Sequence, residues 1–131
     1  GHSFDQYWVV FDKDDFPNND FNEAIRLAES NGFQVAYSNQ AFEYWFLLHF
    51  NMYHGYIHRN DYEQMLSQQM KVKYSKKDNF TTKIYGMLLP YQSEAISRAK
   101  KILTEFNNTP PSQAVSSTTV FKLVEELNKF I

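Results

Sequence analysis

The chain has 131 residues, a formal net charge of −2, a hydrophobic content of 43% and no cysteine. This length indicates one domain that can bury a core, and the lack of cysteine excludes disulfides and thiolate metal sites. No apolar run approaches membrane-spanning length and no signal peptide is visible, so we expect a cytoplasmic protein without a membrane segment.

The first predicted element is a strand at Trp8–Phe11, a run of aromatic and β-branched residues that is too short for a buried helix. Such a run is typical of a strand covered on both faces in the middle of a parallel sheet. It stops at Asp12, Lys13, Asp14 and Asp15. On an extended backbone Asp12 and Asp14 point the same way, so they predict a Mg²⁺ or Mn²⁺ site at the carboxyl end of the strand. The alternative is a solvated strand end with turn and cap residues.

A helix and a second strand are expected next. Asp20 is placed to cap a helix that ends at Asn31-Gly32, and residues 33–37 alternate between apolar and polar side chains as a strand does. A strand, a helix and a strand form a βαβ unit with a right-handed crossover. The sequence therefore predicts the doubly wound α/β class, with a mainly parallel sheet flanked by helices.

A buried helix is predicted over residues 40–50, because this segment is apolar almost all round. Glu43, in its first turn, has two interpretations. The helix dipole favours a carboxylate there, but a helix that starts at the end of the second strand also brings Glu43 near the acids of the first. His49 is either a hydrogen-bonded core histidine or part of the same site.

The rest of the chain is predicted to be helical. Capping signals at Asp61, at Thr81 or Thr82 and at Pro90 each open a helix, and residues 120–130 form the last one. The densest basic stretch consists of Lys71, Lys73, Lys76 and Lys77. These lysines suit contact with a nucleic-acid backbone, and the alternative is a solvated loop.

The charges are unevenly distributed along the chain. Residues 1–66 carry ten acids against three bases, whereas residues 67–131 carry ten bases against five acids. In an enzyme that cleaves phosphodiesters, the basic half would hold the polyanion and the acidic half the metal ion. The same asymmetry is also typical of Lys-rich helices with a solvated face, so both interpretations stay open.

Several blocks of the sequence resemble the RloB-like family. The blocks are residues 8–14, 36–39, 42–50, 73–76 and 117–127. The Asp-Lys-Asp block and the Phe-Glu-Tyr-Trp block are the specific ones, and the Asn-Pro usual before the last block is missing. The resemblance implies a role in bacterial restriction and phage-defence loci, including abortive-infection pairs in which the partner is an ATPase.

The RloB-like family in turn resembles the Toprim fold, which implies a magnesium-dependent nuclease in the intact protein. Asp12 and Asp14 would bind the metal, while Glu43 and His49 would be further catalytic residues. Toprim domains also use a Glu on an earlier strand, and the residues before Trp8 do not supply one. Gly1-His2-Ser3 resembles a tag remnant, so residues 4–131 are expected to be the C-terminal portion of the domain.

This departure has consequences for function. The isolated portion is expected to be inactive and to need the missing N-terminal segment or a second chain. The alternative to a nuclease is a non-catalytic module that senses a ligand or docks on an ATPase partner. The resemblance does not indicate whether the nucleic acid is DNA or RNA.

Overall fold

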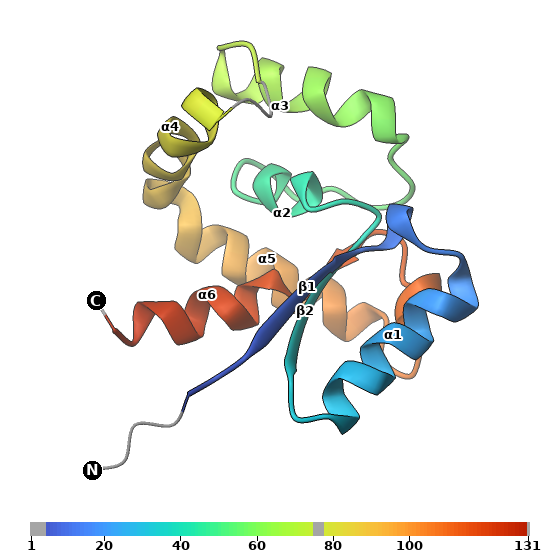
Figure 1. The fold of residues 1–131 in the computed structure, drawn as a ribbon. Coiled ribbons are helices and arrows are strands. Elements are labelled where there is room, and N and C mark those ends of the chain that lie inside the picture. The colour runs from blue at the N-terminus through green and yellow to red at the C-terminus, as the bar shows by residue number, and fades with distance from the viewer. Residues whose placement is uncertain (1–4, 75–77, 131) are drawn as a thin grey trace.

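The computed structural model describes residues 5–74 and 78–130, and only the backbone of Asp15, Arg59 and residues 78–82. Three strands and six α-helices occur in these ranges, joined by short 3₁₀ turns (Figure 1). They are β1 (Trp8–Asp12), α1 (Asn18–Ser30), β2 (Gln34–Asn39), α2 (Glu43–Leu47), α3 (Tyr62–Met70), α4 (Asp78–Leu88), α5 (Gln92–Glu105), β3 (Ser117–Thr118) and α6 (Val120–Asn128). The predicted α/β class is confirmed.

The sheet is mixed and has the strand order β1-β2-β3. β1 and β2 are parallel, with a register that runs from Trp8 beside Gln34 to Asp12 beside Ser38. β3 is antiparallel to β2 and extends its carboxyl end by two residue pairs. The first two strands and α1 form the expected βαβ unit, whereas the doubly wound, Toprim-like arrangement stays a prediction.

The interpretation of β1 as a central strand is wrong for the described part of the chain. β1 is an edge strand, because only β2 pairs with it there. Its residues are mostly half-buried and Val10 is 47% exposed. A continuous apolar run predicts burial on both faces, but it does not reveal whether a second strand covers the edge.

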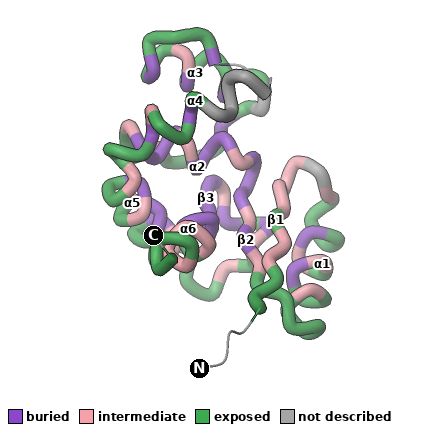
Figure 2. Tube along the Cα trace, turned by 60° about the vertical axis from the view of Figure 1, so that its left-hand side comes forward, coloured by how far each residue is buried: buried purple, intermediate pink, exposed green. Residues whose placement is uncertain are grey.

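Helices cover both faces of the β1–β2 pair. α1 lies on one side and α6 on the other, while α3 and α4 lie beyond α2, away from α1 (Figure 1). The buried positions gather in β2, β3 and α2, between these layers (Figure 2). Tyr44, Leu47, Leu48, Tyr62 and Leu66 are among the most deeply buried side chains of the core.

Two predicted helices differ in length from the observed ones. α1 begins at Asn18, so Asp20 lies in its first turn instead of capping it. α2 has five residues, although residues 40–50 were predicted to be helical throughout. The first predicted turn is absent because the Gln40 carbonyl accepts a hydrogen bond from the backbone of Asp14 and the Gln40 side chain accepts one from Ile57.

The capping signals of the later helices predicted their starts only in part. Asp61 precedes α3 but makes no side-chain cap, and a 3₁₀ turn at residues 59–61 is capped by His58 instead. α4 begins at Asp78, so Thr81 and Thr82 lie inside it. Pro90 lies in a 3₁₀ turn that leads into α5. Within the described ranges, no helix combines the length and the apolar character needed to cross a bilayer.

Candidate functional site: acids at the carboxyl end of β1

Asp12 and Asp14 lie at the carboxyl end of the parallel pair, but on different backbone structures. Asp12 is the last residue of β1 and stands beside Ser38 of β2, whereas Asp14 lies in a 3₁₀ turn. The backbone N–H of Asp14 donates to the Gln40 carbonyl at 3.0 Å, which ties this turn to the chain leaving β2. The expected extended geometry is therefore wrong, because the strand ends before Asp14.

Asp14 carries an unsatisfied buried oxygen. Its side chain is half-buried, and its Oδ2 is shielded from solvent without a hydrogen-bond partner in the described residues. Lys13, between the two aspartates, donates its ammonium to the Phe16 carbonyl at 3.0 Å. A buried carboxylate oxygen without a donor carries a desolvation cost that a cation would relieve.

Glu43 lies in the first turn of α2 and is 6% exposed. A hydrogen bond joins its side chain to the buried hydroxyl of Tyr74. Burial raises the pKa of Tyr74 far above its usual value, and the negative charge of Glu43 and this hydrogen bond raise it further. Glu43 thus has the hydrogen-bonded partner that a buried carboxylate needs.

Tyr62 links the two acidic segments. It is 2% exposed, and its hydroxyl finds no hydrogen-bond partner within the described ranges. Burial raises the pKa of Tyr62 most, and the charges of Asp14 and Glu43 add to the rise. The amides of Gln40 and Ala41 oppose the rise but do not reach hydrogen-bond geometry. Asp14 and Glu43 therefore both lie near one buried hydroxyl.

The acids provide oxygen ligands but do not form a complete metal cage. Among residues 5–74 and 78–130, no three His, Asp or Glu side chains gather as metal ligands. A Mg²⁺ site needs only one or two carboxylates, because this ion keeps several waters and also binds substrate phosphates. Asp12 and Asp14 fit that donor set.

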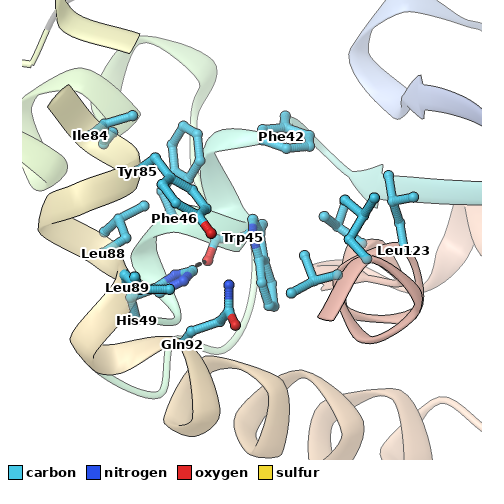
Figure 3. Close-up of a pocket in the computed structure, with 13 residues that line it drawn as sticks. Phe42, Trp45, Phe46, His49, Ile84, Tyr85, Leu88, Leu89, Gln92 and Leu123 are labelled. Carbon is cyan, nitrogen blue, oxygen red and sulfur yellow. Dashed lines mark hydrogen bonds between the residues drawn. The ribbon is translucent and has the colours of Figure 1, made fainter. Parts of the chain in front are cut away.

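His49 lies elsewhere. It follows α2, is 3% exposed and lines an apolar pocket that none of the acids contacts (Figure 3). Its Nδ1 is 3.0 Å from the Trp45 carbonyl. Burial lowers the pKa of His49, the backbone carbonyls of Trp45 and Phe46 raise it, and the nearby positive charge of Arg98 lowers it further. The structure does not bring His49 to the aspartates.

The predicted basic stretch is described only in part. Lys71 and Lys73 are exposed, while Lys76 and Lys77 lie outside the described residues. Lys71 ends α3 with a left-handed backbone conformation, at a φ of 59°. Lys73 directly precedes Tyr74, whose hydroxyl is bound to Glu43. The start of the basic stretch is therefore attached to the acid site.

Three residues at or near these sites were not expected from the sequence. Tyr62 begins the buried stripe of α3, which continues at Leu66 and Met70, so helical periodicity could have found it. Tyr74 lies among the lysines of the basic stretch, inside the block at residues 73–76, and nothing local indicated its contact with Glu43. Arg98 lies in α5, and its guanidinium donates to the Leu48 carbonyl at 2.7 Å.

The fold and the acid site define an α/β protein with carboxylates where a parallel strand pair ends. The family model for RloB-like protein matches residues 1–127, nearly the whole chain. The chain therefore belongs to the RloB-like family. Neither the curated proteins nor the solved structures yield a match.

Proposed function

We propose that the chain is a Mg²⁺- or Mn²⁺-dependent nuclease domain that acts in phage defence. Asp12 and Asp14 would hold the cation, and a bound cation would neutralise phosphate charge and activate water for attack on phosphorus. Family membership and the position of the two aspartates support this proposal. A Toprim-like fold is part of the same proposal.

The observation that carries the proposal is the buried Oδ2 of Asp14. A carboxylate oxygen that is shielded from water and receives no hydrogen bond destabilises the folded chain when no metal is bound. A bound metal ion would be coordinated by this oxygen. The unsatisfied Tyr62 hydroxyl beside it could then donate to a carboxylate. Glu43 would act as an outer acid, held by Tyr74. His49 has no part in this site.

The basic stretch provides the proposed contact with nucleic acid. Lys73 is adjacent to Tyr74, which contacts Glu43, so its ammonium can lie beside a phosphate near the acids. Lys71 is exposed on the same segment, and Lys76 and Lys77 would extend it. Lysines that contact the phosphates of a nucleic acid increase affinity without sequence preference, and salt screens this attraction.

The test is calorimetric titration of the chain with MnCl₂ and MgCl₂. We expect saturable binding that weakens by about tenfold or more in Asp14→Asn, because an amide is a neutral and poorer ligand for these ions. Asp20→Asn is the matched control, since Asp20 is an exposed acid in the first turn of α1. Its affinity should equal that of the unchanged chain.

Two outcomes would contradict the metal site. One is an absence of saturable binding by the unchanged chain, and the other is equal affinity of Asp14→Asn and Asp20→Asn. Cleavage of DNA and of RNA is then assayed with the intact protein. A chain that binds metal but supports no cleavage in that form would contradict the nuclease and keep the metal site.

The second candidate function is a non-catalytic module that senses a ligand or docks on an ATPase partner. It is favoured by the incomplete ligand set, because the described residues bring together no three potential metal ligands. This function predicts that Asp12→Ala/Asp14→Ala alters association with the ATPase while nuclease activity is absent throughout.

A further inference from the structure

A pocket unrelated to the acids opens between α2, α4, the start of α5 and α6 (Figure 3). Its volume is about 320 Å³, within the range of about 300 to 1,000 Å³ that is usual for small-molecule sites. Its walls are mostly apolar and include the rings of Phe42, Trp45, Phe46 and Tyr85. Two polar side chains also line it, His49 and Gln92.

His49 presents a hydrogen-bond acceptor to this pocket. A carbonyl oxygen can only accept, so the contact between Nδ1 and the Trp45 carbonyl requires a proton on Nδ1. Burial lowers the pKa of His49, which keeps the ring neutral and leaves Nε2 without a proton. Nε2 accepts no hydrogen bond from any residue that the structure describes, so this acceptor is available to a ligand.

Gln92 presents a donor. Its side-chain oxygen accepts a hydrogen bond from Asn128 Nδ2 at 3.0 Å, which fixes the orientation of the amide. The amide nitrogen then points into the pocket, on the side of His49 and Trp45 (Figure 3). The pocket thus combines stacking surfaces with an acceptor at His49 and a donor at Gln92, which come from different elements.

We propose that this pocket binds a nucleobase or a closely related planar heterocycle. The edge of such a ring carries a donor next to an acceptor, as in the N6 amino group and N7 of adenine. The donor would face His49 Nε2 and the acceptor would face the Gln92 amide, while the ring contacts Trp45 and Phe46. No acid contributes, so this inference does not depend on the metal site.

Adenosine is the probe, and the fluorescence of Trp45 is the readout. The chain has two tryptophans, so the background variant Trp8→Phe makes Trp45 the sole reporter. We expect saturable quenching by adenosine, with affinity about tenfold weaker in Gln92→Leu and in His49→Phe, since each loses one hydrogen bond. Gln68→Leu, which changes an exposed glutamine of α3, is the matched control.

The proposal would be overturned by the absence of saturable quenching, by unchanged affinity in both Gln92→Leu and His49→Phe, or by equal or tighter binding of naphthalene, which has no polar edge. Tighter binding of phenylalanine amide than of adenosine would assign the pocket to a partner's aromatic side chain and would also overturn it. If His49→Phe does not fold, as judged by circular dichroism, Gln92→Leu decides alone, because Gln92 is only half-buried.

Discussion

The two sides of α2 differ in how their buried polar groups are satisfied. Glu43 and His49 are almost equally buried, at 6% and 3% exposure. Around Glu43 the structure leaves an oxygen of Asp14 and the hydroxyl of Tyr62 without partners in the described residues. Around His49 the ring is bonded to its own segment and faces an apolar pocket.

The difference shows that burial alone does not identify a functional polar residue. On the carboxylate side, unsatisfied atoms and several negative groups lie close together, which destabilises the folded chain. A bound cation would remove this destabilisation. On the histidine side, a pocket is lined mostly by apolar side chains, so a planar ligand ring can bind there. A five-residue helix separates the two environments.

The largest expected effect is on the apolar side. Trp45→Ala should lower the free energy of unfolding by about 3 to 5 kcal/mol, because Trp45 is 4% exposed and packs in the core. Urea denaturation measures the change. Trp8→Ala is the matched control and should cost clearly less, since Trp8 is half-buried on the edge strand. Equal losses would contradict the assignment of Trp45 to the core.

The next effect concerns the satisfied part of the carboxylate side. Tyr74→Phe should lower the free energy of unfolding by about 1 to 3 kcal/mol, because it removes a hydrogen bond to a buried carboxylate. Tyr85→Phe, at an exposed ring of α4, should change stability very little. Equal stability of the two variants would show that Tyr74 does not hold Glu43.

Tyr62→Phe should act in the opposite direction. The lost hydroxyl has no partner in the described residues, so its removal should raise the free energy of unfolding by about 1 kcal/mol without metal. The same variant should bind Mn²⁺ more weakly if this hydroxyl supports the metal-bound carboxylates. Thermal unfolding with and without MnCl₂ measures both effects. Destabilisation in the absence of metal would contradict the view that the hydroxyl is unsatisfied.

The sequence predicted the parts of the fold that depend on local patterns. Periodicity predicts the strand at residues 8–11 and the apolar stripe of α6. The end of α1 at Asn31-Gly32 follows from Gly32, which adopts a left-handed backbone conformation there. β3 was missed because it has two residues, and its pairing with β2 depends on contacts about 80 residues apart in sequence. Propensity carries no information on such pairings.

The candidate site was predicted at the level of residues and only partly at the level of geometry. The aspartates and Glu43 were expected near each other because strand ends meet at one edge of a sheet, and the charges of Asp14 and Glu43 both raise the pKa of Tyr62. His49 was grouped with them by family resemblance, but it is six residues beyond Glu43 and faces the other side of α2. Tyr62 and Tyr74 approach from elsewhere in the chain, which no local pattern shows.

The smallest expected effect is a pH dependence of stability that originates at His49. Its pKa is lowered in the folded chain by burial, while in the unfolded chain it is about 6.5. As the pH falls below about 6.5, the unfolded chain takes up the proton first, so stability is present above this pH and is lost as the pH falls towards the folded pKa.

His49→Phe should remove this part of the slope between pH 7 and pH 5, measured by urea denaturation. Tyr85→Phe, which changes an exposed ring of α4, should follow the unchanged chain. If His49→Phe kept the full slope, the pKa of His49 would not be lowered in the folded chain. The ring would then not be held neutral, and the proposed base pocket would lose its Nε2 acceptor.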